Sequence, residues 1–560
     1  MATITSVMSE PQAPPLVDPK LFPVLTPGQL ERAAAHGRKR TIAQGEVLLD
    51  VGEKPSRIWV VTRGLLDVVR SSDRSYDRFT QLGPGQFTGE VGTLSGRLAL
   101  IRIQAVEPGE VIEIELENLR VIVQTDSELS DVIMRSFILR RLSLIERHLS
   151  DAVLIGSNHC AGTLRIRDFL TRNDHPYSEI DLDRETDVEE LMKRFHISVA
   201  DVPVLICRGN QILRNPSNQQ IADCLGLNAA VDVTKPRDLV IVGAGPSGLA
   251  AAVYGASEGL DVLVVEATAP GGQAGSSSKI ENYLGFPTGI SGHELATAAH
   301  AQARKFGADL LVARVATRLQ CGRRPYVVTI GEEQASSRAV IIATGAEYRR
   351  LPVDNIARFE GAGVYFSATP MEGQLCRGEE VIVVGGGNSA GQAAVFLAQT
   401  AKRVHMLVRS KSLADTMSRY LILRIEQHPS IDLRLGTEVV GVAGDRHLER
   451  VTCREKATDN VKEHAIRHLF VMAGADPNTQ WLQECVALDS KGFIKTGTDL
   501  TAEDLEAAKW PLGRQPFLLE TSLPGVFAVG DVRSGNMKRV ASAVGEGSIA
   551  VALAHRVLAE

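Results

Sequence analysis

The most informative absence in this chain of 560 residues is the absence of paired cysteines. No two of its seven cysteines show CxxC or CxC spacing; they stand at positions 160, 207, 224, 321, 376, 453 and 485. This scatter predicts neither a disulfide framework nor a zinc site, and we expect no bound metal. It is typical of a protein kept in the reducing cytoplasm.

The chain also has few aromatic residues and no excess of basic ones. Aromatics make up 5% of the residues and the net charge is -6, which argues against a general nucleic-acid surface. The N-terminus has no basic region followed by an apolar core, so no secretory signal is visible. The one long apolar stretch, Leu239 to Ala256, fits a buried strand, a glycine turn and a helix better than a membrane span. We therefore predict no nucleic-acid and no membrane partner.

The length and the first third of the chain predict several domains. At roughly 100 to 200 residues per domain, the chain should hold three to five. Residues 1–20 are rich in proline and polar side chains and predict a flexible arm. From Thr41 to about Leu116, short apolar runs alternate with Gly, Pro and Ser-Asp turns. This rhythm predicts a β-roll within 21–150, which a helix at Ser127 to Leu149 closes.

The segment GQFTGEVGTLSG in this roll resembles the phosphate cassette of cyclic-nucleotide-binding domains. The resemblance implies that Glu90 holds a ribose hydroxyl, but Ala99 stands where the family has the arginine for the cyclic phosphate. Loss of that cation would be costly for a buried phosphate, although Arg97 or Arg102 could substitute. Two hypotheses remain: a cyclic nucleotide or other ligand binds near Glu90, or the roll serves for docking or dimerisation, which we prefer.

Residues 151–230 change to alternating strands and helices, with the runs DAVLIGS, TLRIRDFLTRN, YSEIDLD, DVEELMKRF and VPVLICRGNQIL. This order resembles a glutaredoxin or thioredoxin-like domain, with SNHCAGT at the place of its CxxC and Val202-Pro203 at the place of its cis-proline. Cys160 remains at the first cysteine position and Thr163 replaces the second. The dipole of a helix stabilises a thiolate at its N-terminus, so Cys160 is a candidate catalytic thiol. It could equally be a relic, because no neighbouring thiol would resolve a mixed disulfide.

The run RDLVIVGAGPSGLAAAVYGASEGLDVLVVEA forms a complete βαβ unit for a dinucleotide. Gly243 permits the turn, Gly245 lets a pyrophosphate approach the backbone, and Gly248 lets helix and strand pack closely. Helix amides, including that of Ser247, would face the phosphates. Glu266 ends the second strand, where it can bind the adenosine ribose hydroxyls.

The run VIVVGGGNSAGQAAVFLAQTAKRVHMLVRS repeats the plan. Its turn is predicted to consist of Gly385, Gly387, Asn388, Ser389 and Ala390. Its second strand ends on Arg409 and Ser410 in place of an acid. Because an acid repels a 2'-phosphate and an arginine attracts one, this second site should prefer NADPH to NADH.

Four further runs resemble the low-molecular-weight thioredoxin reductases: PGGQAGSSSKIENYLGFP, IIATGAEYRRLPV, VMAGADPNT and PGVFAVGDVRSGNMKRVASAVGEGSIA. The resemblance covers nearly all of 237–560. It implies FAD in a domain at 237–351 and 475–560, an inserted NADPH domain at 352–474, rotation of one domain against the other, and a homodimer. The residues that it places at the FAD are Gly272, Gln273, Asn282, Thr344, Gly345, Asp531, Arg539, Val540 and Ala541, the last three at a helix start that would stabilise negative charge on the reduced ring.

The usual redox dithiol of that family is missing. Matching GVYFSATPMEG to the family places Ser367 and Pro370 at its two cysteines. Serine without a base is a poor nucleophile and has no two-electron redox couple, and proline has neither property. We therefore predict that these two positions are not redox active, and that Cys376 is a buried structural thiol.

The predicted fold is multidomain: an N-terminal β-roll, a thioredoxin-like α/β domain, and two nested Rossmann-like domains for FAD and NADPH. We consider three functions. The first is an NADPH-oxidising flavoenzyme of the thioredoxin-reductase type whose flavin reduces a redox protein or small molecule directly. The second is an orthodox thioredoxin-disulfide reductase that uses dispersed cysteines such as Cys160. The third is a regulatory protein that senses NADPH or a ligand with little turnover.

Overall fold

The computed structural model describes residues 19–71, 76–90, 93–94, 97–146, 152–157, 160–182, 198, 201–207, 211–228, 232, 235–445, 447–482 and 485–560. The predicted helix DVEELMKRF and nearly all of the predicted arm at 1–20 lie outside these residues. The chain divides into two compact units, Met1–Leu149 and Ser150–Glu560.

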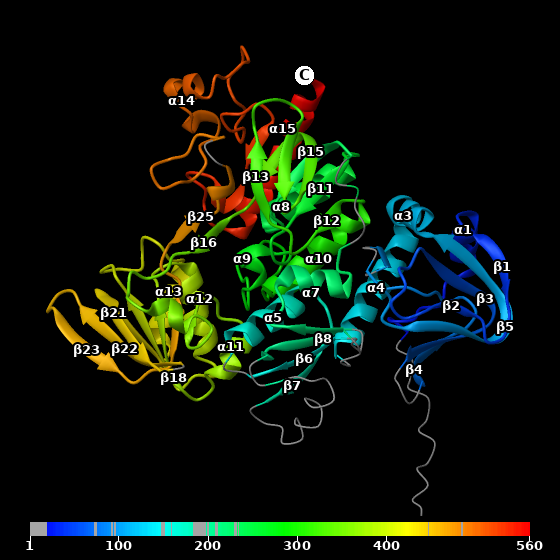
Figure 1. Cartoon of the computed structure of the whole chain (residues 1–560), viewed down its shortest axis with the longest axis horizontal. Coiled ribbons are helices and arrows are strands. Elements are labelled where there is room, and N and C mark those ends of the chain that lie inside the picture. The colour runs from blue at the N-terminus through cyan, green and yellow to red at the C-terminus, as the bar shows by residue number, and fades with distance from the viewer. Residues whose placement is uncertain are drawn as a thin grey trace, which may run out of the picture. The chain divides into compact units, whose positions relative to one another are not determined.

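The first unit is an antiparallel β-roll with helices, coloured blue in Figure 1. Its strands run in the order β1-β5-β3-β4, and β2 pairs with β5. Phe87 and Phe137 lie in its core. The predicted roll and its closing helix are confirmed. The elements are α1 (Pro27–Ala35), β1 (Arg38–Ile42), β2 (Val47–Leu49), β3 (Arg57–Ser71), β4 (Tyr76–Leu82), β5 (Arg102–Glu115), α3 (Leu116–Thr125) and α4 (Ser127–Glu146).

The second unit begins with a small mixed sheet in the order β7-β6-β8-β9. β6 and β7 are parallel, while β8 runs antiparallel to β6 and to β9. The Val202-Pro203 peptide bond is cis, as predicted. The elements are β6 (Ala152–Gly156), α5 (Ala161–Arg172), β7 (Ser178–Asp181), β8 (Val204–Cys207), β9 (Gln211–Arg214) and α7 (Asn218–Leu225).

The largest sheet follows, in the order β12-β11-β10-β15-β14-β13 with β26 paired to β15. β26 is parallel to β15 and comes from the end of the chain, so this body is built from two separate stretches of sequence. The apolar run at Leu239 to Ala256 is a buried strand, turn and helix, as predicted. The elements are β10 (Arg237–Val242), α8 (Pro246–Ser257), β11 (Val262–Val265), α9 (Gly272–Gly275), α10 (Gly292–Lys305), β12 (Asp309–Leu311), β13 (Ala316–Gln320), β14 (Tyr326–Ile330), β15 (Glu333–Ile342), α14 (Ala502–Ala507), β26 (Val526–Ala528) and α15 (Val540–Ala559).

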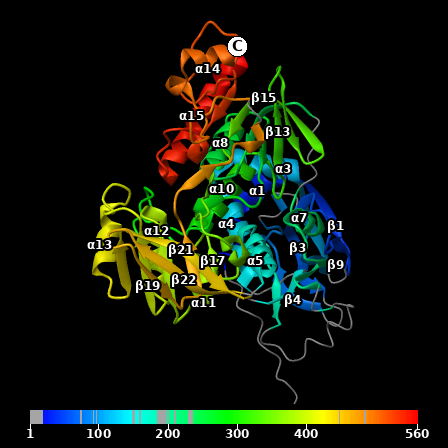
Figure 2. The ribbon, with the colours of Figure 1, turned by 60° about the vertical axis from the view of Figure 1, so that its left-hand side comes forward.

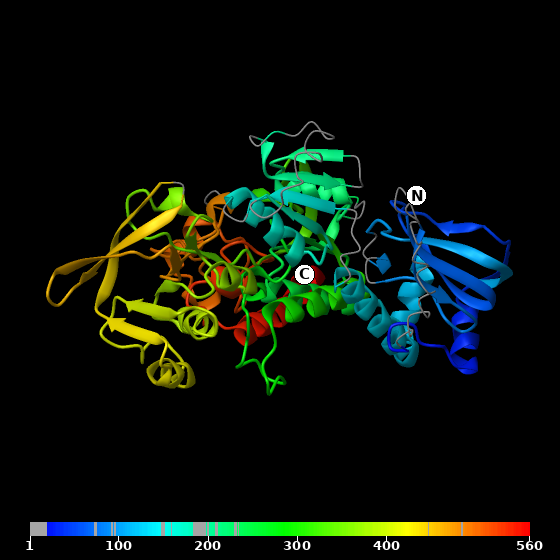
Figure 3. The same ribbon diagram turned by 90° about the horizontal axis from the view of Figure 1, so that it is seen from below.

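A second parallel sheet, in the order β17-β24-β18-β19-β20, lies between those two stretches in sequence and carries its own three-stranded sheet β21-β22-β23. Figures 2 and 3 show it as a body distinct from the largest sheet. The pair of β16 (Ala346–Tyr348) and β25 (Ala475–Pro477) marks the two crossings between the bodies. The elements are β17 (Val364–Tyr365), α11 (Pro370–Leu375), β18 (Glu380–Val384), α12 (Asn388–Leu397), β19 (Arg403–Val408), α13 (Arg419–Gln427), β20 (Ile431–Leu435), β21 (Thr437–Gly444), β22 (Leu448–Glu455), β23 (Asn460–His464) and β24 (His468–Val471).

The expectation that no cysteines pair is wrong for two of the seven. Cys321 and Cys485 form a disulfide, with their Cα atoms 5.9 Å apart and a sequence separation of 164. Local spacing could not show this pair, because the inserted second sheet separates the two cysteines along the chain. Cys160 is half-buried, and the other free cysteines are buried.

Within the described residues, no helix combines the length and the apolar character that a bilayer span requires. Nor does that part of the chain contain a cluster of His, Cys, Asp and Glu side chains able to hold a metal ion.

Candidate functional site

The first glycine turn lies between β10 and α8 and leaves no room for side chains. Gly243 has a φ of +104°, and a Cβ atom added to it would lie 2.3 Å from the carbonyl oxygen of Ala343. A Cβ on Gly248 would lie 1.9 Å from the carbonyl oxygen of Gly243. Gly245 is the N-cap of α8, and Ser247 follows in its first turn. These close approaches give the tight cradle that the sequence predicts.

Glu266 directly follows β11 and holds the backbone of this turn through hydrogen bonds. Its carboxylate accepts hydrogen bonds from the backbone N–H of Ala244 (2.7 Å) and of Thr268 (2.9 Å). The side chain is nearly buried. Glu266 thus shapes the backbone of the glycine turn, a role that the sequence motif alone does not reveal.

The second turn, between β18 and α12, repeats this geometry. A Cβ on Gly385 would lie 2.4 Å from the carbonyl oxygen of Met472, and Gly387 is the N-cap of α12. The side chain of Asn388 accepts a hydrogen bond from the backbone N–H of Ser418 at 2.7 Å. Ser389 and Ala390 lie in the first turn of α12.

The charged end of β19, in the second βαβ unit, is open to solvent. Arg409 and Ser410 directly follow β19 and both are exposed. The hydroxyl of Ser410 donates to the carbonyl oxygen of Ser412 at 2.7 Å. At the matching position of the first βαβ unit, Glu266 is nearly buried, whereas the second unit has the exposed guanidinium of Arg409 next to its turn.

Two half-buried acidic residues, Asp531 and Glu546, lie in the turn before α15 and in the N-terminal half of this helix. Arg539 is the N-cap of α15, whose first two residues are Val540 and Ala541. Burial raises the pKa of Asp531, and the charge of Glu546 raises it further against the opposing effect of Lys538. Sequence reasoning missed Glu546, which accepts hydrogen bonds from the backbone N–H of Gly530 (2.7 Å) and from Asn536 (2.8 Å).

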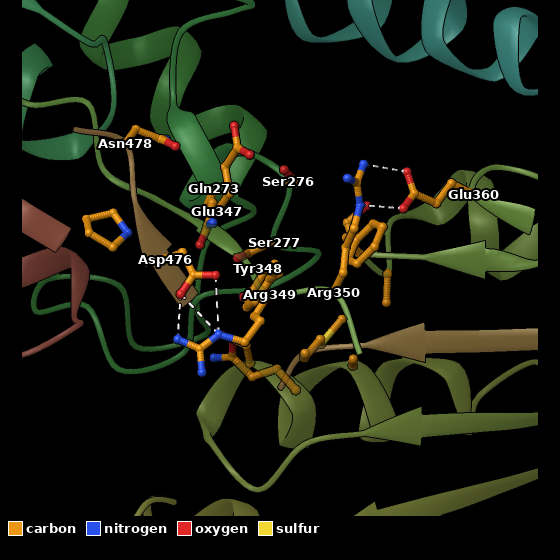
Figure 4. A pocket seen from close by; sticks show the side chains of 18 of the residues that line it. Gln273, Ser276, Ser277, Glu347, Tyr348, Arg349, Arg350, Glu360, Asp476 and Asn478 are labelled. Atoms are coloured by element: carbon orange, nitrogen blue, oxygen red, sulfur yellow. Dashed lines mark hydrogen bonds and ion pairs between the residues drawn. The ribbon is translucent and has the colours of Figure 1, made fainter. Parts of the chain in front are cut away.

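A cavity of about 740 Å³ brings the predicted sites together (Figure 4). Gln273 and Asn478 from the first body line it, as does Ser389 from the second turn. Ser367 also lines it; this residue belongs to GVYFSATPMEG, which we call the edited segment because it lacks the cysteines of the resembled family. The side-chain amide of Gln273 donates to the carbonyl oxygen of Ala346. Of the predicted site residues, Gln273, Ser389 and Ser367 line it, whereas the glycines of both turns, Asn282, Asp531, Arg409 and Pro370 do not.

Charged pairs at the rim were not predicted. Arg349 binds Asp476 through contacts of 2.5–3.2 Å, and Arg350 binds Glu360 at 2.6 Å. Figure 4 shows both pairs flanking Tyr348, whose pKa burial raises. Their signal in the sequence is the run EYRRL, which follows the motif IIATGA directly.

The edited segment presents no thiol to this cavity. Ser367 is half-buried on the cavity wall, and Pro370 is the exposed first residue of α11. Cys376 is fully buried, as predicted, and burial raises the pKa of its thiol to about 11. None of the described residues that line the cavity is a cysteine.

The comparisons with known proteins agree with this architecture. A family model described as "Pyridine nucleotide-disulphide oxidoreductase" matches residues 237–547, more than half of the chain. The chain belongs to this family. A second model, described as "Cyclic nucleotide-binding domain", matches residues 39–126. The oxidoreductase region is thioredoxin-reductase-like, and the N-terminal unit contains a cyclic-nucleotide-binding-type domain.

Individual relatives of this oxidoreductase cover its C-terminal part. A thioredoxin reductase of Mycolicibacterium smegmatis is 33% identical over 323 residues, which are 58% of this chain and 97% of the relative. NADPH-dependent thioredoxin reductase 3 of Arabidopsis thaliana is 31% identical over 369 residues, and the match spans 62% of this chain but only 65% of that protein, less than two thirds. The structure of Lactococcus lactis thioredoxin reductase in its FR conformation matches with a TM-score of 0.52 at 27% identity, over 58% of this chain and 99% of that one.

Cys160 of this oxidoreductase lies outside the cavity wall. It is the N-cap of α5, as predicted, and its sulfur is half-buried. Its neighbour Ala161 contacts the backbone at Gly361, six residues before Ser367. Cys160 therefore lies near the edited segment without lining the cavity.

In the N-terminal unit, the predicted ligand residue Glu90 lies 3.9 Å from Arg141 of α4. Arg102 forms a two-point ion pair with Asp50 at 2.7–2.8 Å, and both Ala99 and Arg97 are buried. Of the two arginines that could replace the missing cation, Arg102 is therefore engaged by a carboxylate.

Proposed function

We propose that this protein is an NADPH- and FAD-dependent oxidoreductase of the thioredoxin-reductase type whose flavin passes electrons directly to an acceptor. The observation that carries the proposal is the shared cavity. Gln273 of α9, from a segment assigned to the flavin, and Ser389, from the turn assigned to NADPH, line the same space as Ser367. An acceptor in that space would meet a serine where a dithiol is expected.

The residues of both turns fit the proposed cofactors. Gly243 and Gly248 allow a tight turn that no Cβ would fit, Gly245 has open space beside it, and the N-terminus of α8 presents backbone amides to a pyrophosphate. At the second turn, exposed Arg409 can pair with a 2'-phosphate. Bound there, NADPH would supply a hydride and FAD would carry the electron pair onward.

The beginning of α15 would act on the reduced flavin electrostatically. The backbone amides at Val540 and Ala541 belong to the first turn of a helix 20 residues long. The positive end of the helix dipole stabilises negative charge close to that turn. Glu546, within α15, would hold the preceding loop against the helix through its bond to the N–H of Gly530.

A second candidate is a disulfide reductase that uses Cys160. Two observations favour it: the small domain has the strand order β7-β6-β8-β9 with a cis-proline at Pro203, which supports the thioredoxin-like assignment, and Cys160 caps α5. Against it, Cys207 and Cys224 of the same domain are buried. A single accessible thiol cannot release a mixed disulfide by itself.

Anaerobic addition of NADPH tests the proposal. We expect bleaching of the flavin absorbance, followed by reoxidation by a soluble quinone or oxygen in both the native protein and Cys160→Ser. Turnover with thioredoxin that disappears in Cys160→Ser would favour the second candidate. An absence of bleaching with both NADPH and NADH would leave a regulatory protein with little turnover.

For the N-terminal unit we propose a docking or regulatory role. The ion pairs at Arg102 and Glu90 support this role, because they engage groups that a cyclic nucleotide would need. Titration with cyclic AMP and cyclic GMP should not raise the melting temperature. A saturable rise that Glu90→Gln abolishes would show that the unit senses a nucleotide.

A further inference from the structure

Helix α5 of the small domain contributes to an apolar cluster that continues into the first nucleotide-binding body. Its Ile166, Phe169 and Leu170 are fully buried in one continuous apolar cluster with Leu239 and Ile241 of β10. The small domain and this body therefore share one continuous apolar cluster.

Polar contacts at the C-terminal end of α5 strengthen this attachment. Arg172 donates at 2.9 Å to the carbonyl oxygen of Gly272 in α9, which packs against Gly245 of the flavin turn. Asp174 accepts from Thr297 of α10 at 2.9 Å and lies 3.0 Å from His293. This hydrogen bond raises the pKa of His293. The end of α5 is thus tied to α9, beside the turn that would hold FAD.

The other end of the same helix contacts the second body. Gly361 has a φ of +74°, and a Cβ atom placed on it would lie 2.9 Å from the Cβ of Ala161. Figures 1 and 2 show α5 beside α11. One helix therefore contacts α9, beside the flavin turn, at one end and the segment before Ser367 at the other.

We propose that α5 is a strut that holds the second body in the arrangement in which Gln273 of α9 and Ser389 of α12 line one cavity. This inference rests on the proposed function in one respect, the assignment of cofactors to the two turns. Ser367 and Pro370 cannot relay electrons, so the chemistry contains no step in which a dithiol must replace the nicotinamide at the flavin. Without that step, the second body need not rotate away from the first, and a contact that fixes the two bodies would not slow turnover.

Two half-buried carboxyl groups, Asp168 of α5 and Glu372 of α11, interact electrostatically between the two bodies. Burial raises the pKa of Asp168 in α5, which Arg172 opposes at 3.7 Å. Burial also raises the pKa of Glu372 in α11, hydrogen bonds from Thr369 oppose this, and the charge of Asp168 adds to it.

Tyr365 and Cys376 also interact with Glu372, and burial raises the pKa of both. The charge of Glu379 acts on these two groups as well. A carboxyl whose pKa is raised at a contact favours that contact while protonated. The strut should therefore loosen as the pH rises from the usual carboxyl range through the raised values.

Hydrogen exchange of the full-length, flavin-loaded protein tests the strut. We expect residues 361–376 to exchange equally slowly, within about twofold, in the oxidised protein, with NADPH, and after reduction by dithionite. Exchange that rises severalfold on reduction by either reagent would overturn the strut. Flavin absorbance in the same samples reports the proposed function separately, because dithionite reduces the flavin even if NADPH does not.

A matched pair of variants isolates the contact. Ala161 and Ala502 are exposed first residues of α5 and α14. Ala161→Trp should collide with Gly361 and accelerate exchange of 361–376 at least threefold, whereas Ala502→Trp should not. Equal exchange in the two variants would contradict the strut.

The carboxyl pair provides a gentler variant. Glu372→Gln should slow exchange of 361–376 at pH 8 relative to the native protein and leave it unchanged at pH 5, and Glu503→Gln, which is exposed on α14, should change neither. The opposite sign, faster exchange in Glu372→Gln at pH 8, would mean that the ionised carboxylate supports the contact.

Discussion

The two βαβ units of this protein share one backbone plan and differ at the end of the second strand. In the first unit Glu266 is nearly buried and holds the backbone of its own glycine turn. In the second βαβ unit Arg409 is exposed, and the carbonyl oxygen of Met472 leaves no room for a Cβ atom at Gly385 of the turn. Under the proposed function, the backbone geometry would allow a dinucleotide to bind, and the side chain at this position would set which dinucleotide each unit prefers.

The largest expected effect comes from filling the two cradles separately. Gly243→Val should abolish flavin retention, because its Cβ would lie 2.3 Å from a carbonyl oxygen at a φ of +104°. Gly385→Val should leave flavin content unchanged and weaken NADPH binding more than tenfold. Flavin absorbance per protein and anaerobic NADPH titration measure the two effects. Equal loss of flavin in both variants would show that the units do not act separately.

The next effect concerns the choice of nicotinamide. Arg409→Glu should weaken NADPH binding by about tenfold to a hundredfold, since a charge-assisted hydrogen bond contributes roughly 1.5–3 kcal/mol. NADH binding should change little. The ratio of kcat/KM for the two nucleotides measures this preference. Arg450→Glu on β22, also exposed, is the matched control, and an equal change there would point to a general effect of charge.

A smaller effect tests the structural role of Glu266. Glu266→Gln keeps one acceptor oxygen but loses the charge and one of the two bonds to Ala244 and Thr268. We expect a loss of about 1–2 kcal/mol in the free energy of unfolding, measured by urea titration of the flavin-free protein. The same stability as the native protein would mean that the turn does not depend on this carboxylate.

The smallest effect concerns the buried acid of the first body. Because burial raises the pKa of Asp531, the unfolded state ionises first as the pH rises above about 4, and the folded state loses stability until the raised pKa is passed. In flavin-free protein, Asp531→Asn should therefore match the native melting temperature near pH 4 and exceed it increasingly toward neutral pH. A variant that is less stable at neutral pH would reverse this assignment.

The sequence predicted the parts of the site that depend on local spacing. Gly243, Gly248 and Gly385 could be identified because each motif needs small residues at set positions between a strand and a helix. The position of Cys160 before α5 was predictable for the same reason.

Features that depend on contacts across the chain could not be predicted. The Cys321–Cys485 disulfide joins residues on either side of an inserted body, and Glu546 reaches back to Gly530 from within α15. The contact of Ala161 with Gly361 joins two domains that show no common motif. Each feature requires the fold before the residue types acquire a meaning.

The central claim is that electrons leave the flavin without a thiol beside it. The most direct measurement is the rate at which a soluble benzoquinone reoxidises NADPH-reduced protein, compared between the native chain and a variant with its five free cysteines replaced. We predict the same rate within about twofold, with the flavin returning fully to its oxidised spectrum. Flavin that stays reduced in the variant while the native protein reoxidises would contradict the account.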